Sequence, residues 1–132
     1  MIRTLDIRSN QQVQFKEITC SIRQLVRESG IKSGTLLLFV PHTTAAVTIN
    51  ENADPDVATD MIAGLNKLVP FKDGYRHLEG NSAAHIKSSL IGVSEQVIIQ
   101  DGELLLGTWQ GIYFCEFDGP RSRKLHAKIV AG

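Results

Sequence analysis

The stretch TLLLFVPHTTAAVTIN, residues 35–50, decides the fold predicted for this chain. Thr35 to Val40 is an uninterrupted apolar run that Pro41 ends. Six residues are too few for a helix of ordinary length, so the run predicts a central strand covered on both faces. After His42, apolar residues alternate with polar ones through Asn50. This alternation predicts a second strand that buries one face and turns hydroxyl and amide groups to the other.

Three segments have the pattern of helices. Gly30 caps the end of the first, Asp54-Pro55 starts the second, and Ser82 can cap the start of the third, which Gly92 ends. The positions expected to be buried are Ile18, Ile22, Leu25 and Val26 in the first helix, Val57, Met61, Leu65 and Leu68 in the second, and Ile86 and Leu90 in the third.

The remaining segments alternate with a period of two. Residues 4–8 and 13–17 predict an opening hairpin, and Asp101-Gly102 predicts a tight turn between two later strands. Residues 109–117 predict an interior strand and residues 125–129 a last edge strand. About seven or eight strands and three helices, with few parallel connections, predict one α+β domain over residues 1–132.

The composition limits the classes of partner. A chain of 132 residues, 42% of them hydrophobic, is large enough to bury a core without disulfides or metals. Fourteen basic residues balance fourteen acidic ones, and the pI is about 6.9. The only basic cluster, residues 121–124, is short and is expected to be a solvated turn. The charge therefore gives no support for a nucleic-acid or anionic-membrane partner, which would need a concentrated basic field.

The cysteines and the N-terminus indicate the compartment. Cys20 and Cys115 lie in apolar patterns without metal-spaced partners, which favours two small buried hydrophobes. The N-terminal sequence has no apolar run of signal-peptide length, and no other run approaches a membrane span. We therefore expect a soluble cytoplasmic protein.

Two of the four histidines lie in HLEGNSAAHIKSSL, residues 77–90, and a third ends the apolar strand. Three histidines with one open position are typical of a catalytic zinc site. His42, His77 and His85 could form such a set, although their spacing matches no fixed metal signature. The alternative is histidines that cap, bridge or hydrogen-bond, and the residues alone leave both open. His126 is expected at the surface.

Several polar residues are candidates for the same site. Glu51 could act as a general base or hold a histidine tautomer, and Asp60 lies a full turn inside its helix. Gly80-Asn81-Ser82, before a helix, offers backbone N–H groups for a phosphate, and Arg121 could bind an anion with two hydrogen bonds. Each candidate has an alternative role. Glu51 could be a surface charge at a strand end, Asn81 a turn former, and Arg121 a solvated hairpin residue. The other candidates are Asn52, Gln110 and Ser88, and the last is spaced with His85 to line an exposed edge of the third helix.

An ordered set of segments resembles the YjbQ family of secondary thiamine-phosphate synthases. The matches run from residue 36 to residue 123 and cover most of the chain. They include His42-Thr-Thr-Ala-Ala, Ile49-Asn-Glu-Asn, Asp54-Pro to Asp60, His77, Gly80-Asn-Ser-Ala-Ala-His-Ile-Lys-Ser-Ser-Leu90, Gly107-Thr-Trp-Gln-Gly111 and Phe117-Asp-Gly-Pro-Arg121. No single motif is unique to the family, but the ordered set is specific.

The resemblance implies a sandwich-like α+β domain that forms a homotrimer, with polar pockets near the subunit interfaces. It implies a divalent metal, zinc by preference, at His42, His77 and His85, or magnesium where a diphosphate is the substrate. The neighbouring residues that carry over are Glu51, Asn52, Asp60, Asn81, Gln110 and Arg121.

The activity implied by the resemblance joins an aminopyrimidine diphosphate to a thiazole phosphate and releases pyrophosphate. Such a reaction needs anion binding and help for the departing diphosphate. Arg121, Lys87 and the Gly80–Ser82 turn could bind anions, but there is no acidic cluster of the kind that holds diphosphate and Mg²⁺. We therefore expect this synthesis to be a side activity.

Two hypotheses of function follow. The first is a metal-dependent transferase or hydrolase that acts on a small phosphorylated molecule, with Glu51, Asp60 or His85 handling protons. The second is a non-catalytic trimeric protein that binds a metabolite or anion in the same pocket. A purely structural role would not explain the clustered histidines.

Overall fold

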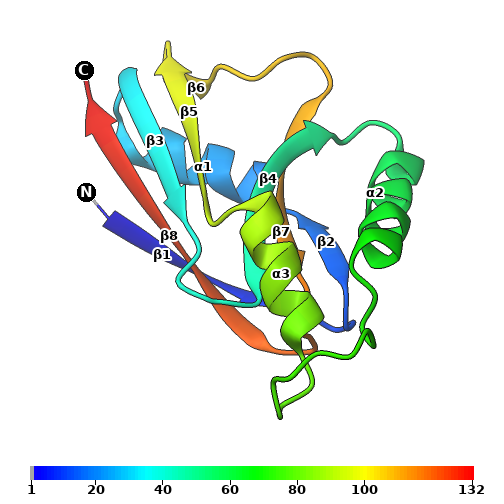
Figure 1. The fold of residues 1–132 in the computed structure, drawn as a ribbon. Coiled ribbons are helices and arrows are strands. Elements are labelled where there is room, and N and C mark those ends of the chain that lie inside the picture. The colour runs from blue at the N-terminus through cyan, green and yellow to red at the C-terminus, as the bar shows by residue number, and fades with distance from the viewer. Residues whose placement is uncertain (1) are drawn as a thin grey trace.

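The computed structural model describes residues 2–132 and confirms the α+β class (Figure 1). Its elements are β1 (Ile2–Arg8), β2 (Gln14–Glu17), α1 (Thr19–Ser29), β3 (Ser33–Phe39), β4 (Ala45–Glu51), α2 (Pro55–Leu68), α3 (Ser82–Ile91), β5 (Ser94–Gln100), β6 (Glu103–Leu104), β7 (Gln110–Glu116) and β8 (Ser122–Ala131). A five-stranded sheet has the order β1-β8-β3-β5-β6, and a three-stranded sheet has the order β2-β7-β4. All the paired strands are antiparallel.

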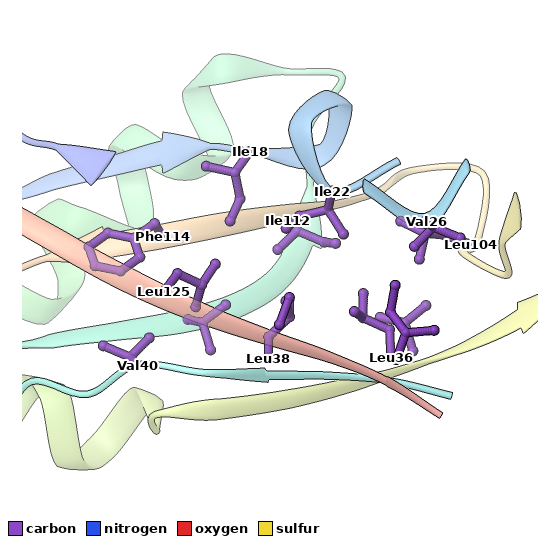
Figure 2. Packing of buried hydrophobic residues seen from close by; sticks show 14 of the residues in the cluster. Ile18, Ile22, Val26, Leu36, Leu38, Val40, Leu104, Ile112, Phe114 and Leu125 are labelled. Carbon is purple, nitrogen blue, oxygen red and sulfur yellow. The ribbon is translucent and has the colours of Figure 1, made fainter. Parts of the chain in front are cut away.

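The main core lies between the two sheets, with α1 closing one side (Figure 2). Ile22 and Val26 of α1 are almost fully buried there, as the helical spacing predicted. Gly30 ends α1 in the left-handed conformation, with φ of 72°, and its N–H donates to the carbonyl of Arg27. The apolar cluster also includes Leu36, Leu38, Ile112, Phe114 and Leu125 from the strands.

β7 has apolar side chains on both faces, as predicted for an interior strand. Ile112 and Phe114 face the main core, whereas Tyr113 and Cys115 face a second cluster on the other side of the three-stranded sheet. α2 and α3 lie over this outer side (Figure 1). The turn at Asp101-Gly102 is also confirmed, with φ of 54° and 76°.

The predicted pairing of the terminal strands is wrong. β1 and β2 do not form a hairpin: β1 pairs with β8, and β2 pairs with β7. β8 is not an edge strand, because it lies between β1 and β3. Alternation identifies a strand, but it carries no information about a partner about 120 residues away.

Burial also departs from the prediction. β3 is covered on one face only, since Leu37 and Phe39 are 36% and 45% exposed. No residue of α2 is buried, and Leu68 is 77% exposed. α3 packs through Ala83, Ala84, Lys87 and Ser88 instead of Ile86 and Leu90, because small side chains let the helix approach β4 closely. Cys20 is exposed, whereas Cys115 is buried.

Within residues 2–132, no helix combines the length and the hydropathy needed to cross a membrane.

Candidate functional site

Three loops meet at one end of the molecule and form a polar pocket of about 390 Å³, which we call the histidine pocket. The first loop follows β3, the second leads into α3, and the third follows β7. Its principal residues are His42, His77, His85, Asn81, Asp118 and Arg121. The structure thus brings together the three histidines, Asn81 and Arg121 that the sequence placed in one site.

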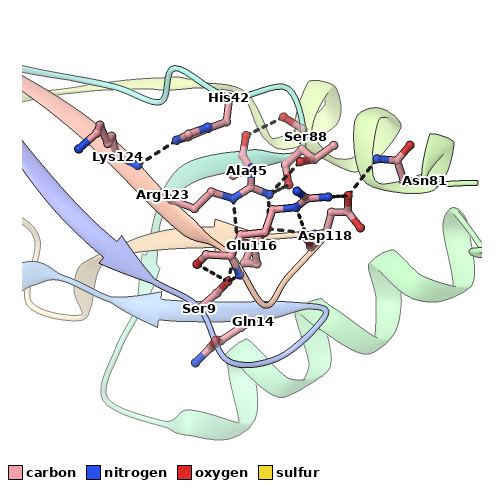
Figure 3. A network of polar contacts seen from close by, with 12 residues as sticks. Ser9, Gln14, His42, Ala45, Asn81, Ser88, Glu116, Asp118, Arg123 and Lys124 are labelled. Carbon is pink, nitrogen blue, oxygen red and sulfur yellow. Dashed lines mark hydrogen bonds and ion pairs between the residues drawn. The ribbon is translucent and has the colours of Figure 1, made fainter. Parts of the chain in front are cut away.

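The histidines occupy two walls of the histidine pocket. The rings of His77 and His85 lie edge to face, with centroids 5.6 Å apart and planes at 82°. His42 lies in the other wall, beside β8, where its Nε2 accepts a hydrogen bond of 2.9 Å from the backbone N–H of Lys124 (Figure 3). Burial, and then the positive charge of Arg123, lower the pKa of His42, so the neutral ring is favoured.

Asn81 is buried at the N-terminus of α3 and has one unpartnered atom. Its Nδ2 donates to Glu79 Oε2 at 2.8 Å and to Asp118 Oδ2 at 2.9 Å. Both bonds require the amide nitrogen, so they fix the orientation of the side chain. Its Oδ1 is buried and accepts no hydrogen bond from residues 2–132. The wall of the histidine pocket therefore contains a buried acceptor without a protein donor.

Arg121 borders the histidine pocket at the turn after β7. Its guanidinium donates to the carbonyl and to the carboxylate of Asp118, at 2.8 Å and 2.9 Å. About half of the side chain is exposed. Arg121 therefore remains available for an anion, but it would have to share its charge with Asp118.

A buried ion pair beneath the histidine pocket was not predicted from the sequence. Arg123, expected in a solvated turn, is only 6% exposed and donates to Glu116, which is 1% exposed, and to Thr44 (Figure 3). Ser9 also donates to Glu116, at 2.7 Å. A signal was present in the sequence: Arg123 has the inward register of Leu125, Ala127 and Ile129, and Glu116 that of Ile112 and Phe114.

The other expected residues lie at the far end of β4. This strand starts at the histidine pocket and runs away from it, so Glu51 is about 20 Å from Thr44. Asn52 lines a separate cavity of about 390 Å³ beside α2. Gln110 is engaged locally, since its Oε1 accepts from the N–H of Gly107 at 2.8 Å. Asp60, on α2, is exposed and does not line the histidine pocket, so the predicted site is divided within one chain.

Three residues of α3 have different positions from those expected. Ser82 lines a shallow neighbouring cavity with His77 and His85. Ser88 is buried and donates to the carbonyl of Ala45 at 2.6 Å, so it ties α3 to β4 instead of lining an exposed edge. Lys87 points into the protein, where Nζ donates to Asn66 at 2.5 Å and lies 4.3 Å from the ring centre of Phe71. Lys87 is therefore not an anion-binding residue of this pocket.

The bond from Ser88 to Ala45 gives a stability prediction. Replacing Ser88 with alanine leaves a buried carbonyl without its donor, and we expect the free energy of unfolding to fall by about 1–3 kcal/mol. The neighbouring Ser89 is exposed, so Ser89→Ala is a matched control and should change stability by less than about 0.5 kcal/mol. Urea denaturation of the two variants at equal protein concentration measures the difference. Equal stability of both variants would contradict the role of this bond.

The residues present do not fit a three-ligand metal site. Among residues 2–132, no three His, Cys, Asp or Glu side chains are grouped so that they could hold a metal ion. His77 and His85 are adjacent, but Nε2 of His42 already accepts the N–H of Lys124. The zinc site expected at the three histidines stays a prediction.

Comparison with known proteins identifies the family. The sequence profile described as UPF0047 protein YjbQ-like matches residues 3–132. The chain belongs to the YjbQ family. UPF0047 protein YugU of Bacillus subtilis (strain 168) is 50% identical to it over 131 residues, which cover 98% of this chain and 99% of the relative. The YjbQ resemblance predicted from the sequence is thus confirmed.

Solved structures of YjbQ proteins confirm the fold. A YjbQ/UPF0047 family protein of Clostridium acetobutylicum superposes with a TM-score of 0.95 at 52% identity, covering 97% of this chain and 99% of that one. A YbjQ-like protein of unknown function from Sulfolobus solfataricus gives a TM-score of 0.96 at 29% identity, covering 100% and 97%. The α+β sandwich therefore persists among YjbQ proteins whose sequences have diverged widely.

Proposed function

We propose that the histidine pocket binds a small phosphorylated molecule that also carries amino or hydroxyl groups, and that it catalyses a transfer or hydrolysis reaction on it. The observation that carries this proposal is the unpartnered Oδ1 of Asn81. A buried amide oxygen without a donor costs about 1–3 kcal/mol, so a ligand that supplies an N–H or O–H group regains that energy. A phosphate alone, with acceptor oxygens only, would not satisfy it.

The charges around the pocket support a ligand of mixed character. Arg121 supplies a positive charge for a phosphate oxygen, whereas the carboxylates of Glu79 and Asp118 disfavour a bare anion. The same carboxylates favour amino groups. A molecule with a phosphate at one end and donors at the other fits both halves of the histidine pocket.

His77 and His85 are the proposed proton-transfer groups. Histidine is the usual side chain for this task near neutral pH, and these two rings lie together in the pocket wall. The candidate reaction that the resemblance supplies is the joining of an aminopyrimidine diphosphate to a thiazole phosphate. Its first substrate carries both an amine and a phosphorylated end, which is the combination inferred above.

A homotrimer is part of this proposal. Leu68 of α2 is 77% exposed, and Leu90 of α3 is 61% exposed. Apolar surface of this kind on two neighbouring helices favours contact with further copies of the chain. In such an assembly Glu51 and Asp60 of one copy could lie beside the histidine pocket of another. That the assembly contains three chains is what the resemblance to the YjbQ family implies.

The second candidate function is a non-catalytic trimeric protein that binds a metabolite or anion. It is favoured by one observation: no acidic cluster for a diphosphate–metal complex is grouped among residues 2–132. The proposed location for either function is the cytoplasm, which is consistent with the free thiols of Cys20 and Cys115.

A direct assay separates the two candidates. Purified protein is mixed with an aminopyrimidine diphosphate and a thiazole phosphate, and release of pyrophosphate and formation of the joined product are measured. We expect turnover, together with binding of the aminopyrimidine diphosphate that Arg121→Gln weakens roughly tenfold. Arg3→Gln changes an exposed residue of β1, so it is the matched control and should bind normally.

The outcomes of this assay are distinct. Binding without product would favour the second candidate, and neither binding nor product would contradict the proposed ligand class. Light scattering of the same sample should give the mass of three chains. A stable monomer at micromolar concentration would refute the proposed assembly.

A further inference from the structure

His42 takes the place of a backbone acceptor at the end of a strand pair. The pairing of β3 with β8 ends at Phe39 and His126. Lys124 lies two residues further along β8, so its N–H points to the same side as that of His126. No residue of β3 is opposite it, and Nε2 of His42 accepts this N–H at 2.9 Å. The imidazole thus continues the hydrogen bonding of the sheet beyond the strand.

This bond determines which nitrogen of the neutral ring carries the proton. A nitrogen that accepts an N–H must present its lone pair, so Nε2 is unprotonated and Nδ1 carries the hydrogen. Turning the ring over would place Cε1 in front of Lys124 and leave a backbone N–H without an acceptor. The protonation of Nδ1 therefore follows from the hydrogen bond itself.

We infer that His42 is a fixed hydrogen-bond donor to the bound molecule, through Nδ1–H, and not a metal ligand. A metal needs a lone pair on the coordinating nitrogen, and the lone pair of Nε2 is already used. Coordination through Nδ1 would move the proton to Nε2. Two hydrogen-bond donors, Nε2–H and the N–H of Lys124, would then face each other without an acceptor. No group of residues 2–132 accepts from Nδ1, so this donor is free for a ligand.

The acceptor on the ligand is a phosphate or carbonyl oxygen. This part of the inference rests on the proposed function, because the ligand is the phosphorylated molecule proposed above. The pocket then has a division of roles: His42 donates from one wall, Oδ1 of Asn81 accepts beside α3, and His77 with His85 remains for proton transfer or a metal.

The tautomer is tested by nuclear magnetic resonance of protein labelled with ¹⁵N at histidine. Long-range proton–nitrogen correlations distinguish Nδ1–H from Nε2–H rings. The variants His77→Gln, His85→Gln and His126→Gln each remove one set of signals and so assign it. The fourth set belongs to His42, which is assigned without being replaced. We expect the Nδ1–H pattern at pH 7.5. An Nε2–H pattern or a charged ring would overturn the inference.

Two additions to the same sample extend the test. Zinc chloride should leave the His42 pattern unchanged, whether or not zinc shifts His77 and His85, and loss of the Nδ1 proton on zinc addition would also overturn the inference. The aminopyrimidine diphosphate should shift the Nδ1 signal of His42, and His42→Gln should weaken binding of this molecule roughly tenfold. An Nδ1–H ring in a protein that does not bind the aminopyrimidine diphosphate would contradict the proposed function and leave the tautomer confirmed.

Discussion

Replacing Arg123 with methionine is expected to lower the free energy of unfolding by about 3–5 kcal/mol. Methionine replaces the aliphatic stem of arginine but carries no charge, so Glu116 would keep a buried carboxylate without its counter-ion. Thr44 would lose the donors that hold the loop beneath the histidine pocket. Removal of one partner of a buried ion pair is among the most destabilising single substitutions.

Two control variants separate the ion pair from general effects. Arg121→Met removes an arginine whose side chain is 48% exposed. It should lower the free energy of unfolding by less than about 1 kcal/mol, since solvent screens the ion pair of Arg121 with Asp118. The double variant Arg123→Met/Glu116→Gln carries no uncompensated charge and should regain about 2 kcal/mol or more. Urea denaturation at fixed protein concentration and pH 7 measures all three. A loss as small for Arg123→Met as for Arg121→Met would refute the role of the pair.

The same pair makes the stability of the protein depend on pH. Burial alone would raise the pKa of Glu116, but hydrogen bonds from Arg123, from Ser9 and from the N–H of Asp118 outweigh it and lower the pKa. The ionised carboxylate therefore stabilises the fold above the pKa of the unfolded chain, and this contribution is lost as the pH falls through the folded value. The difference in the free energy of unfolding between the wild type and the variant Arg123→Met/Glu116→Gln should therefore become smaller as the pH is lowered.

The features that could be predicted from the sequence are local ones. Gly30 at a helix end, Asp54 and Pro55 at a helix start, and Asp101-Gly102 in a turn each act within a few residues of the chain. Their effect depends on backbone conformation and on hydrogen bonds to near neighbours, so it is readable without the rest of the fold.

The features that could not be predicted depend on distant partners. Arg123 was expected in a solvated turn, and only the pairing of the strands in two sheets buries it with Glu116. Glu51 is close to His42 in sequence, yet a seven-residue strand carries it about 20 Å away. The side chain of Ser88 was expected at the surface because the close approach of α3 to β4 depends on two alanines, whose small size gives no strong periodic signal.

Replacing His85 with asparagine is expected to lower the turnover of the proposed transferase reaction by about 10²–10⁴-fold. Asparagine is polar and of similar length, but it cannot transfer a proton near neutral pH. His85 is half-buried in the first turn of α3, and its ring contacts that of His77. The substitution should therefore leave the fold and the assembly intact. Because proton transfer belongs to the chemical step, kcat should fall while KM changes little.

The test uses both a purified enzyme and a bacterial strain that lacks thiamine-phosphate synthase. Wild-type protein should rescue growth without thiamine, and His85→Asn at the same protein level should not. His126→Asn is the matched control, since His126 lies on β8 and its ring bonds Thr4 at the surface. Rescue by His85→Asn would detach the activity from this pocket. A raised KM with unchanged kcat would instead make His85 a binding residue, because a proton-transfer group acts on the reacting atoms and not on ground-state affinity.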